Sequence, residues 1–245
     1  RLGGRAAIVT GAGSGFGAGI ARKFAAEGAT VMVADIDAAA AQRVADEIGG
    51  LAHHADVADA DSVAQMADAA LAAWGRVDIL VNNAGVTHLP AALEDIPDAD
   101  FDRVFDVNCR SVYLTARALV PSMKAAGAGS IVNVASTAGL SPRPRLSWYN
   151  ASKGWMITAT RAMAVELAPA GVRVNALCPV AGETPLLSSF MGEDTPEMRA
   201  KFLSTIPLGR FSTPEDLGNA ACFLASDEAS MITGAVLTVD GGRCI

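Results

Sequence analysis

Tyr149 and Lys153 stand four residues apart in the run WYNASKG, at the start of a helical pattern. Residues at this spacing lie on one face of a helix, so a phenol and an ammonium group can be neighbours there. A free phenol has a pKa of about 10, and an adjacent cation lowers it. The pair indicates a group that exchanges protons at a reacting oxygen, although a tyrosine beside a surface lysine gives the same letters.

A second chemical feature is the run TGAGSGFG at 10–17, which places four glycines in eight positions directly after the apolar run AAIV. Glycine costs conformational entropy on folding, so the bare backbone must serve a purpose. A glycine-rich turn between a strand and a helix presents backbone N–H groups and the positive end of the helix to a phosphate. The run predicts a pyrophosphate cradle, with a merely flexible turn as the alternative.

Asp35 ends the next apolar run, eighteen residues after Gly17. A carboxylate at this position accepts hydrogen bonds from the hydroxyls of an adenosine ribose and repels the extra phosphate of NADP. Ser14 and Ile36 supply no compensating cation, so the sequence favours NAD over NADP. The alternative is that Asp35 caps the following helix, but Asp37 is better placed for that role.

These residues need a scaffold, and the chain alternates short β-branched runs with longer alanine-rich helical patterns. This rhythm predicts crossover connections and a parallel sheet covered on both faces. We expect a single-domain, doubly wound α/β fold of Rossmann type over residues 1–245, with a seven-stranded parallel sheet flanked by helices. The expected strands are 6–10, 30–35, 51–55, 77–83, 130–136, 172–178 and 235–240, and the expected helices are about 15–28, 38–48, 59–74, 100–126, 149–168 and 213–226.

Composition narrows the class of protein. Hydrophobic residues make up 51% and charged residues 18%, which predicts a large core. The net charge of −7, without a basic block, argues against a nucleic-acid partner, and no apolar run approaches the roughly 18 residues of a membrane span. The opening run RLGGRAAIVT leads directly into fold-like sequence, so we expect no signal or transit peptide.

The scattered cysteines, Cys109, Cys178, Cys222 and Cys244, indicate reduced thiols in a cytoplasmic protein and no metal site.

Three irregular segments follow predicted strands, at 85–97, 136–148 and 179–198. Ligands of open α/β sheets bind beyond the carboxyl ends of the strands, so we expect substrate contacts in these segments and a lid at about 179–205. Arg143 and Arg145 are either contacts for a carboxylate or phosphate of the substrate or plain solvated loop charges. An apolar pocket is predicted from Leu140, Leu146, Trp148, Leu186, Leu187, Phe190 and Met191.

With these motifs combined, the chain resembles the short-chain dehydrogenase/reductase family over essentially its whole length. Ser136 lies 13 residues before Tyr149, after the strand SIVNVAS, as that family has it. The other matching motifs are TGAGSGFG at 10–17, DV at 56–57, NNAG at 82–85, Asn108 and Tyr149-x-x-x-Lys153. The resemblance implies an oxidoreductase that assembles as a homotetramer.

The resemblance also implies a role for each catalytic position. Tyr149 would be the general acid/base for the alcohol or carbonyl oxygen, and Ser136 would orient that oxygen. Lys153 would lower the tyrosine pKa and hold the nicotinamide ribose. Asn108 would bind a water that relays protons from Lys153 to solvent, unless it only bridges backbone groups within its helix. Substrate contacts would come from Ser136, Leu146, Tyr149 and Leu187.

The cofactor contacts implied by the resemblance follow the motifs. Gly11, Ser14, Gly15, Phe16 and Gly17 would surround the pyrophosphate, and Asp56 and Val57 would meet the adenine. Further contacts would come from Asp35, Ile36, Asn83, Ala84, Gly85, Tyr149, Lys153, Pro179, Gly182 and Thr184. Asn82 and Asn83 have the alternative role of tying strand ends together.

One stretch departs from the family pattern. After the sixth strand the family usually has Pro-Gly, an apolar residue and then a Thr that meets the nicotinamide carboxamide. Here the run is Pro179-Val180-Ala181-Gly182-Glu183-Thr184, so Val180 replaces the glycine and Gly182 stands where the apolar residue is usual. Thr184 is retained, but the local backbone path differs from the expected one.

The implied reaction is reversible hydride transfer between NAD and a secondary alcohol or ketone, with 3-oxoacyl and polyol compounds among the family's substrates. The nicotinamide cofactor carries the hydride, and the protein positions it and manages the proton. Two other functions stay open: an NAD-binding sensor without redox turnover, and an epimerase or lyase on the same fold. The complete set of Asn108, Ser136, Tyr149 and Lys153 argues against a sensor, because a binding module needs no proton relay.

Overall fold

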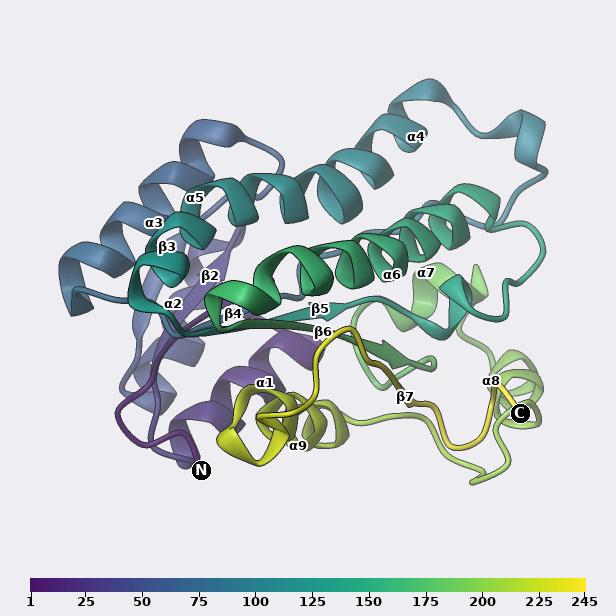
Figure 1. Ribbon diagram of the computed structural model, residues 1–245. Helices are drawn as coiled ribbons and strands as arrows, with labels where there is room; N and C mark the ends of the chain where they lie inside the picture. Colours follow the sequence, from purple (N-terminus) through teal and green to yellow (C-terminus); the bar gives the residue numbers. More distant parts are fainter.

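A single parallel sheet forms the centre of the computed structural model, which describes all 245 residues. The strands are ordered β3-β2-β1-β4-β5-β6-β7, and every neighbouring pair is parallel. The Rossmann-type fold predicted from the sequence is confirmed (Figure 1). The strand bounds are β1 Ala6–Thr10, β2 Thr30–Asp35, β3 Leu51–His54, β4 Ile79–Asn82, β5 Gly129–Val134, β6 Val172–Pro179 and β7 Val236–Val239.

The chain reverses direction across the sheet between β1 and β4. From β1 it proceeds outward through β2 to β3, then returns to pair β4 with the free side of β1. Ala7, Ile8 and Val9 of β1 lie opposite Ile79, Leu80 and Val81 of β4. Such a reversal opens a crevice beyond the carboxyl ends of the two strands, because their connections diverge to opposite faces.

Helices cover both faces of the sheet (Figure 1). The buried cluster on one face joins the strands to α1, α2 and α9, and the cluster on the other joins them to α3, α5 and α6. These helices present alanine, valine and leucine to the strands, as a sheet buried on both faces requires. Their bounds are α1 Gly15–Ala26, α2 Ala38–Ile48, α3 Ala60–Trp74, α5 Ser111–Ala126, α6 Ser147–Leu167 and α9 Pro214–Ala225.

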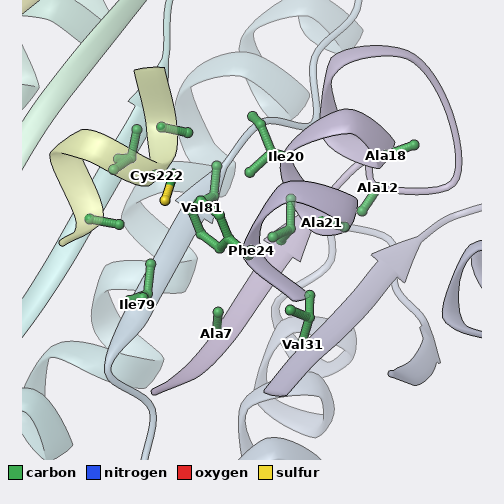
Figure 2. Packing of buried hydrophobic residues seen from close by; sticks show 14 of the residues in the cluster. Ala7, Ala12, Ala18, Ile20, Ala21, Phe24, Val31, Ile79, Val81 and Cys222 are labelled. Carbon is green, nitrogen blue, oxygen red and sulfur yellow. The ribbon is translucent and has the colours of Figure 1, made fainter. Parts of the chain in front are cut away.

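Phe24 of α1 anchors the first of these clusters. Its ring lies beside Val81 of β4 and close to Cys222 of α9, so one side chain joins two helices to the middle of the sheet (Figure 2). The side chain is completely buried. Burial of a phenylalanine contributes about 2–3 kcal/mol, and this anchor fixes α1 at the glycine-rich turn.

The predicted helix over 100–126 is divided in the structure. α4 spans Asp98–Phe105, a π-helical turn spans Asp106–Arg110, and α5 follows. A π turn inserts an extra residue into the helical ladder and is frequent at functional sites. Short 3₁₀ turns complete the fold at Leu93–Asp95, Thr137–Gly139, Ala168–Ala170 and Asp227–Ala229.

The lid segment, residues 179–205, contains two short helices that the irregular composition did not predict. They are α7 Leu187–Met191 and α8 Pro196–Leu203. α8 begins where the hydroxyl of Thr195 accepts a hydrogen bond from the backbone N–H of Met198, with Pro196 at the first helical position. Both helices are held by a lid cluster composed of Val180, Leu187, Met191, Phe202, Ile206 and Phe211. None of the helices in the fold has the length and apolar character needed to cross a membrane.

Candidate active site

A cleft of about 450 Å³ lies at the carboxyl ends of the strands. One wall comes from the glycine-rich turn after β1, the floor from the loops after β4 and β5, and the roof from the lid segment. The largest concave site of an open α/β sheet is the default ligand site. The sequence analysis predicted the cofactor and substrate contacts in these same loops.

The glycine-rich turn leaves the N-terminus of α1 available to an anion. Ser14, the residue before the helix, makes no capping bond with its side chain, and the first turn contains no acidic residue. Unpaired N–H groups at a helix N-terminus bind phosphate well. Gly17 does not line the cleft, and a Cβ there would collide with the carbonyl of Gly11 and the amide of Asn83. Gly17 allows helix α1 to approach the strand ends.

Asp35 connects the end of β2 to the glycine-rich turn. Its Oδ2 accepts a 2.8 Å hydrogen bond from the N–H of Gly13, and its Oδ1 accepts a 2.9 Å bond from the N–H of Asp37. The carboxylate also lines the cleft. Asp37, not Asp35, caps α2 through its bond from the N–H of Ala40. Asp35 is therefore fixed at the cleft edge with its charge facing the ligand space.

The remaining predicted cofactor residues line the same cleft. Thr10 holds the loop after β4 in place, because its hydroxyl accepts hydrogen bonds of 3.1 Å from the N–H groups of Asn83 and Ala84. Asn82 and Asn83 tie strand ends together, through bonds to Asn133 and to the carbonyls of Thr10 and Gly11. The lining positions are Gly11, Ser14, Gly15, Phe16, Asp35, Ile36, Asp56, Val57, Asn83, Ala84, Gly85, Tyr149, Lys153, Pro179, Gly182 and Thr184.

Tyr149 lies in the first turn of α6 and projects into the cleft. The ring of Phe190 from α7 packs against it, with ring centroids 5.1 Å apart. Burial raises the pKa of Tyr149 to about 12, and a hydrogen-bonding interaction with the Ser136 side chain opposes that rise. The lowering of this pKa expected from Lys153 is not seen in this arrangement, and burial of the phenol is the largest cause of the rise.

Lys153 lies one helical turn after Tyr149, as the spacing predicted. Its Nζ is 5.9 Å from the centre of the Tyr149 ring and donates a 3.0 Å hydrogen bond to the carbonyl of Val134. Burial lowers the pKa of Lys153 to about 8. The Lys153 side chain is thus a buried amine that loses its proton more readily than a free lysine does.

Ser136 and Asn108 support this pair from neighbouring elements. Ser136 follows β5, lines the cleft, and its hydroxyl accepts a 3.1 Å bond from the N–H of Ala138. Asn108 lies in the π-helical turn, completely buried behind the cleft. Its amide exchanges 2.9 Å bonds with the backbone of Val86 and donates a 3.0 Å bond to the hydroxyl of Ser152. Asn108 therefore joins the loop after β4 to α6, whereas backbone bridging was expected only within its own helix.

The departure from the family pattern after β6 has a packing explanation. Val180 is buried in the lid cluster, where its side chain packs with the lid helices. At Gly182 a Cβ would collide with the ring of Phe16 and lie 2.9 Å from the carbonyl of Ser212. The glycine stands two positions later than in the family pattern, where the chain packs on the Phe16 ring of the glycine-rich turn. Thr184 still reaches the cleft beside Gly15.

The substrate end of the cleft differs in part from the prediction. Leu146, Leu186 and Phe190 line it as expected. Leu187 does not; it points into the lid cluster, because successive residues of a helix face different directions. Leu140, Trp148 and Met191 also lie outside the lining. Arg143 does line the cleft, as do Val86 and Phe202, which lie in the segments predicted at 85–97 and 179–205. Val107 also lines it, and no motif pointed to that residue.

These residues fit a dinucleotide on chemical grounds. An uncapped helix N-terminus provides N–H donors for a pyrophosphate. A carboxylate fixed at the end of β2 provides an acceptor for ribose hydroxyls, and a buried ammonium faces the middle of the cleft. The donor and acceptor set matches the alternation of charges and hydroxyls in a nicotinamide dinucleotide.

Comparison with known proteins decides the family. The family model described as enoyl-(acyl carrier protein) reductase matches residues 11–243. The chain belongs to the short-chain dehydrogenase/reductase family. A crystal structure of 3-ketoacyl-(acyl-carrier-protein) reductase from Brucella melitensis complexed with NADH is 52% identical, covers 100% of both chains and has a TM-score of 0.95.

Two curated relatives of this short-chain dehydrogenase/reductase are also similar over nearly their whole length. The 4-formylbenzenesulfonate dehydrogenase of Comamonas testosteroni is 48% identical, covering 98% of this chain and 97% of the relative. The cis-4-hydroxycyclohexanecarboxylate dehydrogenase of Sinomonas cyclohexanicum is 40% identical, covering 97% and 96%. The chain is an oxidoreductase, and the redox function is favoured over a sensor or an epimerase.

Proposed function

We propose that this short-chain dehydrogenase/reductase transfers hydride between NAD and a secondary alcohol or ketone, with Tyr149 as the general acid/base. The observation that carries the proposal is the meeting of Tyr149, Ser136 and Lys153 in the cleft that also contains the glycine-rich turn. Residues 1–245 act as one catalytic domain, and the lid segment covers the substrate.

The chain's own residues manage the proton of the reacting oxygen. The bound nicotinamide supplies or accepts the hydride. Tyr149 gives a proton to the carbonyl oxygen in reduction and removes it from the alcohol in oxidation. Ser136 donates a hydrogen bond to the same oxygen, and Lys153 would hold the nicotinamide ribose. Asn108 supports a water that carries protons between Lys153 and solvent.

Asp35 supports NAD as the cofactor rather than NADP. The carboxylate lines the cleft and is fixed by two backbone bonds. A fixed negative charge accepts bonds from ribose hydroxyls and repels a phosphate at the same place. The neighbouring Ile36 is exposed and uncharged, so it offers no compensation.

The substrate class follows from the lining and the relatives. Leu146, Phe190 and Phe202 make the end of the cleft near Tyr149 apolar. The names of these relatives mention a formylbenzenesulfonate, a hydroxycyclohexanecarboxylate and a 3-ketoacyl compound. An oxygen-bearing carbon on a hydrocarbon skeleton is common to all three. The hydroxycyclohexanecarboxylate is a secondary alcohol and the 3-ketoacyl compound is a ketone, whereas the formyl group is an aldehyde. We take a secondary alcohol or ketone as the substrate.

The proposal includes a cytoplasmic homotetramer. All four cysteines are free thiols, as is usual in a reducing compartment. Large apolar side chains are exposed on α5 and α6, among them Tyr113, Trp155 and Val165. Such residues favour contacts between subunits. Light scattering should give a particle of four chains of 25.0 kDa.

The test is a screen of secondary alcohols and ketones with NAD and with NADP, followed by absorbance of the reduced cofactor. The proposal predicts one reduced cofactor for each ketone formed, with NAD as the better cofactor. An epimerase would convert substrate without net reduced cofactor, and a sensor would bind cofactor with no conversion of any compound. Either result would overturn the proposed function.

A further inference from the structure

Arg143 is a cation at the substrate end of the cleft that has no acidic partner. The residue lies in the segment between β5 and α6, is half-buried and lines the cleft together with Tyr149. No carboxylate lies within 4.0 Å of its guanidinium, although ten of the other arginine and lysine side chains form such ion pairs. A partly buried arginine normally has a partner that compensates its charge.

The structure holds the Arg143 side chain in place by apolar and weak polar contacts. Its guanidinium carbon lies 4.2 Å from the centre of the Phe202 ring, and Nη2 is 3.4 Å from the hydroxyl of Thr205. Stacking on an aromatic ring fixes the plane of the group and leaves its edge donors free. Both Phe202 and Arg143 belong to the cleft lining, so the arginine is oriented by the lid segment.

A second arginine increases the positive charge at this place. Arg243, in the C-terminal segment, is near enough to repel the Arg143 guanidinium. Gly241 and Gly242 pack on Ile206, Pro207 and Leu208, directly after Thr205, which brings the C-terminal segment beside the lid. The Nε of Arg243 is buried and has no hydrogen-bond partner. Neither of these two arginines forms an ion pair with a carboxylate, so their positive charge is uncompensated within the chain.

We infer that the substrate carries a carboxylate or sulfonate group, bound by Arg143 with Arg243 behind it, while its alcohol or ketone carbon lies at Tyr149. This inference rests on the proposed function and adds the chemical class of the substrate. The apolar side chains of Leu146 and Phe190 line the same cleft and suit a hydrocarbon or aromatic skeleton that joins the two ends. Arg143 is a binding residue and takes no part in proton transfer.

The experiment compares substrates of the same shape and different charge. The pair is para-(α-hydroxyethyl)benzoate and its neutral carboxamide, with the para-sulfonate as a second anion. The wild-type enzyme should prefer the anions over the amide by at least about tenfold in kcat/KM, as expected for a charge-assisted bidentate bond. Equal kcat/KM for acid and amide would overturn the inference without any variant.

Substituted enzymes then test which residue causes the preference for the anionic substrate. Arg143→Gln should reduce the ratio of acid to amide by about 10- to 100-fold. Arg143→Lys keeps the positive charge but loses the two parallel N–H donors of the guanidinium, so it should give an intermediate ratio of acid to amide. Arg145→Gln is the matched control: Arg145 is exposed, lies two residues away and does not line the cleft, so its ratio should equal that of the wild type. Equal losses in Arg143→Gln and Arg145→Gln would indicate a general electrostatic field and contradict a specific site.

A binding measurement separates this inference from the proposed function. The ketones para-acetylbenzoate and para-acetylbenzamide are titrated by calorimetry into the enzyme with oxidised NAD, a combination that cannot transfer hydride. Tighter binding of the acid, lost in Arg143→Gln, supports the anion site even if no alcohol is oxidised. Oxidation of the two corresponding alcohols, without any preference in binding between the acid and amide ketones, would support the dehydrogenase and refute the anion site.

Discussion

The ring of Phe190 in the lid packs edge-on against the ring of Tyr149, with centroids 5.1 Å apart and planes inclined by 61°. This contact joins the lid segment to the proposed acid/base and helps to bury the phenol. Burial is the main reason that the pKa of Tyr149 stands at about 12, and we expect the ring of Phe190 to contribute to that burial. A neutral phenol is the form that donates a proton in ketone reduction.

Phe190→Ala should lower the pKa of Tyr149, because water replaces the ring that covers the phenol. Alcohol oxidation needs the deprotonated tyrosine, so the ascending limb of its pH–rate profile should move to lower pH by roughly 0.5 to 1 unit. The substrate KM should rise as the apolar contact is lost. Phe101→Ala removes an aromatic contact outside the cleft and should leave the profile in place; a similar shift there would contradict the explanation.

Ser136→Ala should move the ascending limb of the pH–rate profile for alcohol oxidation to higher pH. The interaction with Ser136 lowers the pKa of Tyr149, so its removal raises that pKa and reduces the deprotonated fraction at any pH below it. Turnover should fall by about 10²-fold or more, because the hydroxyl also orients the reacting oxygen. Ser141→Ala, in the same segment but outside the cleft lining, is the control. A shift to lower pH in Ser136→Ala would refute this role.

Asp35→Asn should weaken the preference for NAD over NADP by roughly tenfold or more, measured as the ratio of kcat/KM values. The substitution keeps the shape of the side chain and one acceptor oxygen, but it removes the charge that repels the extra phosphate. Asp37→Ala should cost about 1 kcal/mol of stability through loss of the α2 cap and leave the cofactor ratio unchanged. An unchanged ratio in Asp35→Asn would show that another group selects the cofactor.

Val180→Gly should loosen the lid without disturbing the sheet. Loss of the buried side chain removes about 2 kcal/mol from the lid cluster, and glycine adds backbone freedom. Limited proteolysis should cut residues 179–205 faster, and the substrate KM should rise more than kcat falls. Val180→Ala separates the two causes, since it loses side chain without the added backbone freedom. Equal protease resistance in all three proteins would contradict the packing role of Val180.

The sheet was predictable because its signals are local and repeated. Val9, Val33 and Val132 stand in short β-branched runs separated by helical patterns, and this rhythm determined the order of elements and the parallel pairing. The proximity of Tyr149 and Lys153 was predictable because they share a helix, where sequence spacing fixes direction, whereas Ser136 and Asn108 were named from the family resemblance. Asp35 and the glycine-rich turn were found for a similar reason, since both directly follow strands.

What the sequence did not predict depends on contacts between distant segments. The composition of 179–198 suggested a loop, whereas burial of Val180, Leu187 and Phe202 against one another stabilises two short helices there. The orientation of Leu187, away from the cleft, follows from that packing. The pKa of Tyr149 also depends on how deeply the lid buries it, which a spacing of four residues does not specify.

The most direct test of Tyr149 as the acid/base is Tyr149→Phe, with NADH affinity and turnover measured on the same preparation. The substitution removes only the hydroxyl and keeps the ring that packs on Phe190. Titration by NADH fluorescence should give a Kd within about threefold of the wild type, while kcat falls by about 10²- to 10⁴-fold, the usual contribution of general acid/base catalysis. Turnover close to that of the wild type, with NADH still bound, would contradict the assignment of Tyr149.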